Sequence, residues 1–161
     1  NIIAVARKKK EEEIGKKVLL LEDMQDPGNL GTIIRSAVAF NIDTIILSTK
    51  TVDLYNSKVI RSTQGMLFHI NIIVREPEEI INELKEKDYE ILGTKVDGGK
   101  DIKNINKKEK FVLIIGNEGK GMSSALSNLC DEYLYIKTNN NVESLNAGVA
   151  ASIILYELGS K

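Results

Sequence analysis

Short apolar runs alternate along the chain with stretches in which apolar residues recur at helical spacing. A continuous run such as Val18-Leu19-Leu20-Leu21 is typical of a strand buried on both faces of a sheet. Turn-forming residues such as Asp26-Pro27-Gly28 separate the runs from the helical stretches. The pattern predicts strands over residues 18–21, 44–47, 70–74, 90–94, 111–115 and 133–136. It predicts helices over residues 29–40, 56–63, 77–87 and 144–158.

Strands that alternate with helices predict an α/β fold with a mainly parallel sheet flanked by helices. The 161 residues are enough for one domain with a sizeable core. A polar stretch, residues 97–110, interrupts the alternation and carries no predicted helix or strand.

The composition is that of an ordinary globular protein, with 42% hydrophobic and 28% charged residues. The net charge is −1, so any basic surface for a nucleic acid must be local. Cys130 is the single cysteine and cannot form an intrachain disulfide, which fits the cytoplasm. No apolar run approaches the roughly 20 residues of a membrane span and no signal peptide is visible, so we expect no membrane partner.

The first 17 residues differ from the rest of the chain. They contain the run Arg7-Lys8-Lys9-Lys10-Glu11-Glu12-Glu13, which is typical of a solvated linker. No initiator methionine precedes this run. We therefore expect residues 1–17 to be a linker cut from a longer chain and residues 18–161 to form the folded domain.

Two common phosphate-binding motifs are absent. The segment after the first predicted strand lacks the G-x-G-x-x-G spacing of a dinucleotide site, so an ordinary Rossmann enzyme is not expected. A P-loop beginning at Gly116 would need lysine where Met122 stands. The glycine-rich turn instead comes late, after the predicted strand 111–115, and suits a cofactor held by C-terminal loops.

Three separated stretches carry polar side chains that a core does not need: residues 29–35 (Asn-Leu-Gly-Thr-Ile-Ile-Arg), 114–119 (Ile-Ile-Gly-Asn-Glu-Gly) and 143–146 (Glu-Ser-Leu-Asn). A guanidinium such as that of Arg35 matches phosphate oxygens better than an ammonium does. Ser144 and Asn146 lie near the start of a predicted helix, where anionic groups such as an RNA phosphate are favoured.

Each of these positions also has a structural alternative. Arg35 fits a surface position, and Asn29 and Ser144 both fit helix N-caps. Glu118 fits a turn between two glycines. His69 is the only histidine and is expected to be structural, so with one histidine and one cysteine no protein metal site is expected.

Together the three stretches resemble the three motifs of the SpoU (TrmH-type) family of RNA ribose 2'-O-methyltransferases, within the SPOUT class. The resemblance runs from about residue 18 to about residue 158. It implies a C-terminal trefoil knot whose loops hold S-adenosylmethionine, and a homodimer formed through the knot region. Many members carry a small N-terminal RNA-binding domain, so residues 1–17 are expected to be its end or the linker that follows it.

The resemblance also implies the site residues. The positions that match the catalytic motifs are Asn29, Arg35, Glu118, Ser144 and Asn146. The positions that match the cofactor contacts are Leu92, Gly93, Thr94, Gly116, Asn117, Ile136 and Leu145. Ile136 and Leu145 suit a core as well as an adenine pocket. The family's usual Ile-Pro-Met is replaced by Ile136-Lys137-Thr138, and the missing proline should leave this loop less rigid.

The chemistry assigns a role to each implied catalytic residue. A guanidinium is a cation and a poor base, so we assign Arg35 to clamping an RNA phosphate. Ser144, Asn146 and Glu118 would orient the ribose hydroxyl and relay its proton. The identity of the proton acceptor stays open.

The expected activity is S-adenosylmethionine-dependent 2'-O-methylation of a ribose in RNA, with ribosomal RNA favoured over transfer RNA. Two alternatives stay open: a transfer RNA 2'-O-methyltransferase, and a non-catalytic RNA-binding module on the same fold. Residues 147–155 are small or apolar on nearly every helical face, which favours a homodimer.

Overall fold

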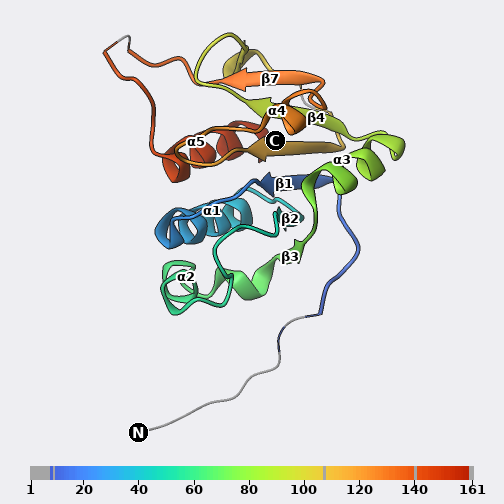
Figure 1. The fold of residues 1–161 in the computed structure, drawn as a ribbon, viewed down its shortest axis with the longest axis vertical. Helices are drawn as coiled ribbons and strands as arrows, with labels where there is room; N and C mark the ends of the chain where they lie inside the picture. Colours follow the sequence, from blue (N-terminus) through green and yellow to red (C-terminus); the bar gives the residue numbers. More distant parts are fainter. Residues whose placement is uncertain (1–7, 9, 107, 140, 160–161) are drawn as a thin grey trace, which may run out of the picture.

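A computed structural model describes residues 8, 10–106, 108–139 and 141–159. Residues 1–7 and 9 of the expected linker lie outside the described residues. The described chain forms one 7-stranded sheet in the order β3-β2-β1-β6-β4-β7-β5, flanked by helices (Figure 1). All described strand pairs are parallel, so the predicted α/β class is confirmed.

The strands are β1 (Lys17–Leu21), β2 (Thr44–Leu47), β3 (Asn71–Val74), β4 (Glu90–Thr94), β5 (Lys100–Asp101), β6 (Phe111–Ile115) and β7 (Glu132–Tyr135). The helices are α1 (Pro27–Ala39), α2 (Ser57–Ser62), α3 (Pro77–Glu86), α4 (Ser124–Ser127) and α5 (Ala147–Gly159). Two short 3-10 helices, η1 (Met66–His69) and η2 (Ile102–Asn104), complete the elements.

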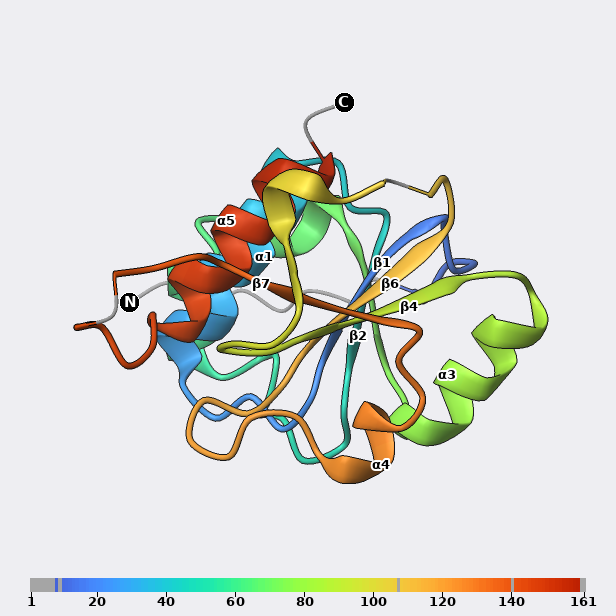
Figure 2. The same cartoon turned by 90° about the horizontal axis from the view of Figure 1, so that it is seen from above.

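The sheet separates two hydrophobic cores because successive side chains of a strand point to opposite faces. Leu19 and Leu21 of β1 belong to the cluster that packs against α1 and α5. Val18 and Leu20 belong to the cluster that packs against α3 and α4. Figure 2 shows α1 and α5 together on one side of the strands and α3 on the other. A central strand that is apolar on both faces is therefore what this layered fold requires.

Most predicted elements are present, and the differences lie at their ends. The helix predicted over residues 29–40 begins at Pro27 because Asp26 caps it. The helix predicted over residues 144–158 begins only at Ala147. The strand predicted over residues 133–136 is shifted to Glu132–Tyr135.

Some regions contain elements that the hydrophobic pattern does not predict. The polar stretch 97–110 contains β5 and η2, and residues 124–127 form α4. The pattern does not predict the short η1, residues 66–69, either. These elements are two to four residues long, too short to show a helical or strand period. The trefoil knot implied by the family resemblance stays a prediction.

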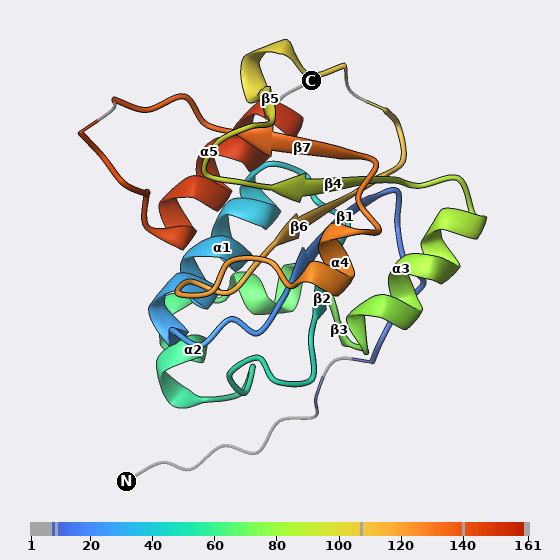
Figure 3. The same cartoon turned by 45° about the horizontal axis from the view of Figure 1, so that its top comes forward.

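The segment between β7 and α5 reaches out from the body of the molecule, and Figure 3 shows it leaving the sheet and returning to the start of α5. Ile136 and Leu145, at the two ends of this segment, are partly buried. None of the helices in the described part of the chain is both long and apolar enough to cross a membrane.

Candidate active site

The carboxyl ends of the central strands bring the three polar stretches together. In open α/β sheets ligands bind at this edge, outside the ends of the parallel strands. β1 ends at Leu21 in register with Ile115, the last residue of β6. The next backbone amide, that of Glu22, donates to the Ile115 carbonyl over 2.9 Å. The loops that follow the two strands therefore begin side by side.

The N-termini of α1 and α5 open at the same place. The Asp26 side chain accepts from the Asn29 amide at 2.7 Å and caps α1. The Asn146 Oδ1 atom accepts from the Val149 amide at 3.2 Å, one residue before α5 begins. Asp26 and Asn146 are thus the capping residues, and the alternatives that made Asn29 and Ser144 the N-caps are wrong.

The two helices lie against each other along their length (Figure 1). The hydroxyls of Ser36 and Ser152 are 2.7 Å apart, and the rings of Phe40 and Tyr156 meet edge to face at 5.5 Å. Gly148 allows this approach near the helix starts, because a Cβ there would lie 3.2 Å from Asn146 Oδ1 and 3.3 Å from Asn29 Oδ1. Close packing of the helices therefore fixes the distance between the first and third polar stretches.

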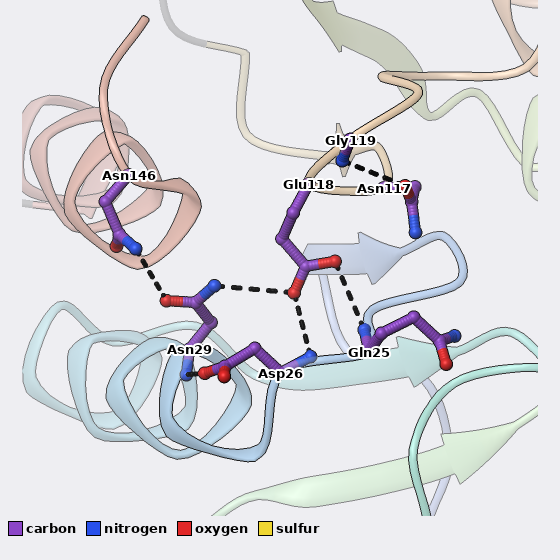
Figure 4. A pocket seen from close by; sticks show the side chains of 7 residues that line it. All are labelled: Gln25, Asp26, Asn29, Asn117, Glu118, Gly119 and Asn146. Atoms are coloured by element: carbon purple, nitrogen blue, oxygen red, sulfur yellow. Dashed lines mark hydrogen bonds between the residues drawn. The ribbon is translucent and has the colours of Figure 1, made fainter.

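A chain of hydrogen bonds joins all three stretches (Figure 4). The Asn146 Nδ2 group donates to Asn29 Oδ1 at 3.0 Å. The Asn29 Nδ2 group donates to Glu118 Oε1 at 3.4 Å. These three side chains, with Asn117, Gln25, Asp26 and Gly119, line a pocket of about 440 Å³.

Glu118 is held as an anion by amide groups. Its carboxylate accepts from the backbone amides of Gln25 at 3.2 Å and Asp26 at 3.0 Å, next to the positive end of α1. Partial burial by itself would raise the pKa of Glu118, but these backbone hydrogen bonds and the one from Asn29 outweigh it and lower the pKa. Glu118 therefore stays charged near neutral pH and ties the turn after β6 to the start of α1.

The Asn117 side chain stabilises the same turn after β6 through hydrogen bonds within it. Its Oδ1 atom accepts from the backbone amides of Gly119 and Lys120, each at 3.0 Å. Its Nδ2 group donates to the Asp23 carbonyl at 2.8 Å. The amide thus shapes the glycine-rich turn and anchors it to the loop after β1.

A larger cleft of about 680 Å³ adjoins this pocket, since Asn117, Glu118 and Gly119 line both. Its walls come from the loops after β4, β6 and β7 and from the first turns of α5. The predicted site residues that line it are Thr94, Gly116, Asn117, Glu118, Ile136, Ser144 and Leu145. Ile154 adds apolar surface, whereas Lys95, Asp97 and Glu143 add charge.

Two of the predicted cofactor positions lie behind the wall of the cleft rather than on it. Leu92 is 1% exposed and packs in the core cluster beneath α5. Gly93 is buried where a Cβ would lie 2.7 Å from Cys130 Sγ and 2.8 Å from the Met122 methyl carbon. Met122 itself lines the cleft, so Gly93 supports a cleft residue instead of facing the cleft.

Gly116 has a structural reason to be glycine besides its place on the cleft. A Cβ at this position would lie 2.3 Å from the Met122 amide nitrogen, and that atom belongs to backbone and cannot move aside. The backbone of residues 121–122 therefore folds back onto Gly116 and closes the turn that begins with Asn117, whose amide bonds to the Gly121 carbonyl at 3.0 Å.

Arg35 lies apart from both hollows. It is exposed on α1, six residues beyond Asn29, and lines neither the pocket nor the cleft. At about 1.5 Å per residue, six residues place it about 9 Å further along the helix. The structure thus brings Asn29, Glu118 and Asn146 into direct contact, places Ser144 on the cleft, and leaves Arg35 on the adjoining helix surface.

Several lining residues were not predicted from the sequence. Gln25 and Asp26 line the pocket through the turn Asp-Pro-Gly, which the sequence marks as a turn but not as part of a site. Met122 and Ile154 line the cleft from segments that read as an ordinary turn and helix core. Among the described residues, no group of three His, Cys, Asp or Glu side chains could hold a metal ion.

Comparison with known proteins agrees with this arrangement. The model of the SpoU rRNA methylase family matches residues 16–156, and all three polar stretches fall inside that range. The chain belongs to the SpoU rRNA methylase family. This confirms the resemblance inferred from the three motifs.

Similar members of the SpoU family include methyltransferases with named RNA substrates. Over 143 residues the chain is 43% identical to 23S rRNA (guanosine(2553)-2'-O)-methyltransferase RlmP of Bacillus subtilis, covering 89% of this chain and 58% of that protein. The chain thus spans less than two thirds of the length of this curated relative.

Two solved SpoU-type structures share the fold and hold the methyl donor. One is the SpoU methyltransferase AviRb from Streptomyces viridochromogenes in complex with AdoMet, with TM-score 0.81, 32% identity, and coverage of 92% of this chain and 61% of that chain. The other is an AdoMet-bound rRNA methyltransferase from Sinorhizobium meliloti, with TM-score 0.84, 31% identity, and coverage of 92% and 57%.

Proposed function

We propose that this chain transfers the methyl group of S-adenosylmethionine to a ribose 2'-hydroxyl of RNA, and that the RNA is ribosomal. The observation that carries the proposal is the hydrogen-bonded chain Asn146–Asn29–Glu118 at the mouth of a cleft that suits the cofactor. Family membership, the 23S rRNA relative and the AdoMet-bound neighbours support it. A reducing cytoplasm, where RNA is found, suits the single free cysteine.

The cleft fits S-adenosylmethionine in size and chemistry. Its volume of about 680 Å³ lies within the roughly 300–1,000 Å³ of small-molecule sites. Ile136, Leu145 and Ile154 offer apolar surface for an adenine ring, and Asp97 and Glu143 offer carboxylates for hydroxyl or cationic groups. When bound, S-adenosylmethionine supplies an electrophilic methyl group on a positively charged sulfur.

The chain's own residues then position the ribose. The amide network leaves the pocket walls with fixed donors and acceptors before RNA arrives, because each side chain is already bonded to the next. Holding two reactants in line is worth up to roughly 7–11 kcal/mol. Ser144, on the wall of the adjoining cleft, is a hydroxyl close enough to the pocket to orient the ribose 2'-oxygen and pass on its proton.

Arg35 is proposed to hold a phosphate of the RNA and not to act as the base. Its guanidinium is a cation, and no carboxylate pairs with it among the described residues. A planar fork with five N–H donors binds phosphate in two places at once. Its position on α1, beyond the pocket, suits a phosphate that neighbours the reacting ribose.

The chain is also proposed to form a homodimer through α5. Val149, Ile153 and Tyr156 share one helical face and are 47%, 37% and 55% exposed. This apolar face borders the exposed stripe of α1 that carries Arg35, so a second copy would cover it beside the site.

Light scattering should give twice the chain mass at tens of micromolar. Ile153→Asp should give a monomer, whereas Val74→Asp, which is also exposed but lies on the edge strand β3, should not.

A methyl-transfer assay tests the proposed activity. Full-length 23S rRNA transcript and transfer RNA transcript are each incubated with the chain and S-adenosylmethionine carrying a radioactive methyl group. Incorporation into the ribosomal transcript that leaves one phosphodiester resistant to alkali is expected, because a 2'-O-methyl group removes the hydroxyl that attacks the phosphate. Incorporation only into transfer RNA would reassign the substrate, and incorporation into neither would contradict the function.

A further inference from the structure

Several lysines at the amino edge of the sheet, where the parallel strands begin, are paired with carboxylates, although Lys17 and Lys110 form no ion pair among the described residues. Lys108 meets Glu90 at 3.3 Å, and Lys85 meets Asp131 at 3.2 Å. The other ion pairs at this edge are Lys16–Glu109, Lys87–Glu83 and Lys100–Glu132. These lysines therefore have their charge largely neutralised within the protein.

Three exposed cations at the opposite, carboxyl edge are among those that form no ion pair within the described part of the chain, whereas Arg75, which follows β3, pairs with Glu11 at 2.6 Å. Lys50 lies in the loop after β2, Arg61 on α2, and Lys120 in the turn after β6, and all are exposed. None of the ion pairs formed among the described residues includes them. We call these residues the rim cations.

Lys50 and Lys120 are tied to pocket residues through their backbone, and Arg61 is tied to the start of α1 through its neighbour Ser62. The Lys50 carbonyl accepts from Gln25 Nε2 at 2.8 Å, and Gln25 lines the pocket. The Lys120 amide donates to Asn117 Oδ1 at 3.0 Å. Arg61 precedes Ser62, whose hydroxyl donates to the carbonyl of Pro27, the first residue of α1, at 3.0 Å. The backbone positions of the three rim cations therefore lie around the opening of the pocket.

The carboxylates near the same opening are occupied by uncharged donors. Asp23 accepts from the Ser48 hydroxyl at 2.7 Å, and Asp26 accepts from the Asn29 amide at 2.7 Å. Glu118 accepts from two backbone amides. These three acids fix loops and helix starts and do not pair with the rim cations, which remain available to a polyanion.

We propose that the rim cations, Lys50, Arg61 and Lys120, contact backbone phosphates of RNA on either side of the nucleotide in the pocket. This inference rests on the proposed function and names the surface through which that substrate is held. In a chain of net charge −1 the overall field does not attract RNA, so affinity depends on such local contacts.

The proposal has a quantitative consequence for salt dependence. Each phosphate contact to a single strand adds about 0.7 to the slope of log affinity against log salt, because it releases bound counterions. Removing three contacts should lower that slope by about 2 and weaken binding at about 50 mM salt by roughly 10-fold or more.

Two triple variants of the full 161-residue chain test it. One combines Lys50→Ala, Arg61→Ala and Lys120→Ala, and the other combines Lys16→Ala, Lys87→Ala and Lys108→Ala at the amino edge. Both lose the same number of positive charges. Fluorescence anisotropy of a labelled oligouridylate of about 20 nucleotides gives affinity at several salt concentrations, and thermal unfolding confirms that each variant is folded.

The expected result is a weaker affinity and smaller salt slope for the rim variant alone. Equal weakening in the two variants would overturn the proposal, since it would show an effect of net charge only. Wild-type affinity in the rim variant would overturn it as well. If the wild-type chain methylates RNA and the rim variant binds RNA with wild-type affinity, this surface is rejected and the proposed function stands. A wild-type chain that binds RNA through these residues without methylating it would reject the function alone.

Discussion

The two edges of the parallel sheet treat polar groups in different ways. At the amino edge, lysines pair with carboxylates across the surface, as Lys108 does with Glu90. At the carboxyl edge, carboxylates such as Glu118 accept from backbone amides, and amide side chains such as Asn29 bridge one helix start to the next. Ion pairs are frequent at the amino edge, whereas hydrogen bonds from amide groups fix the geometry of the carboxyl edge, where the cleft lies.

This difference separates stability from function. Exposed ion pairs contribute about 0–1 kcal/mol each and can be removed with little effect. The hydrogen-bond network at the N-termini of α1 and α5 sets the positions of side chains relative to a ligand. Small changes there should therefore alter activity more than stability. The following predictions test that separation, beginning with the largest effect.

Arg35→Ala should lower methyl transfer on the order of 100-fold, which is the usual cost of losing one group that stabilises developing charge. Affinity for S-adenosylhomocysteine should stay unchanged because Arg35 does not line the cleft. Arg35→Lys should recover little activity, since an ammonium lacks the two-pronged fork. Turnover and calorimetry on the same preparations check this, and weakened cofactor binding with normal turnover would reverse the assignment.

Asn146→Asp should slow methyl transfer about 10- to 100-fold while the protein stays folded. A carboxylate caps a helix as well as an amide does and is favoured by the helix dipole, so α5 keeps its start. It cannot donate to Asn29 Oδ1, so two acceptors would face each other there, and a flip of the Asn29 amide would only move the same conflict to Glu118.

Asn139→Asp is the matched control for that variant. Among the described residues the Asn139 side chain accepts from the Asn141 amide alone, which a carboxylate does equally well. Steady-state rates and melting temperatures of both variants decide the outcome. A normal rate for Asn146→Asp would show that the bond to Asn29 has no part in the reaction.

Gly116→Ala should destabilise the fold by about 1–3 kcal/mol, the usual cost of forcing an extra carbon into packed structure. The melting temperature should fall by several degrees in a chain of this size. Gly119→Ala, in the same turn, should leave the melting temperature unchanged because its Cβ would come no closer than 3.7 Å to Asn117 Oδ1. Similar melting curves for the two variants would contradict the close backbone contact at Gly116.

Glu118→Gln should remove a part of the stability that depends on pH. The folded-state pKa of Glu118 is lowered, so its carboxylate stabilises the fold fully above the unfolded value of about 4.3. That contribution disappears as the pH falls through the lower folded-state pKa. Wild type and variant should therefore differ in stability at pH 6 and converge under acid, as urea unfolding would measure.

Glu109 at the amino edge provides the contrast. The hydrogen bond from Lys16 lowers the pKa of Glu109, and this carboxyl is fully exposed. Salt should therefore erase the effect of Glu109→Gln but only reduce that of Glu118→Gln. Equal salt sensitivity would mean that the two edges do not differ as described.

The sequence predicted the layered fold well because its strands are buried on both faces. The runs at residues 44–47, 90–94 and 111–115 match β2, β4 and β6 at both ends. It failed at the starts of α1 and α5, where the choice of capping residue decides, although it placed the start of α3 at Pro77 correctly. Asp26 and Asn146 are both good capping residues, but so are their neighbours Asn29 and Ser144, and only tertiary contacts choose among them.

The site was predictable where a motif residue reaches the opening through its own side chain. Asn29 bonds to both Glu118 and Asn146, so the three motif residues lie together. Leu92 and Gly93 lie on a strand whose side chains face the two cores, so strand period places them behind the cleft. Gln25 contributes through a loop conformation that no residue pattern specifies.

The most direct test of the account is a calorimetric titration of the 161-residue chain with S-adenosylhomocysteine, followed by a structure of the complex. The account predicts saturable binding of one ligand per chain in the cleft bounded by Ile136, Leu145 and Gly116. No heat at millimolar ligand with a folded protein, or density for the ligand elsewhere, would contradict it.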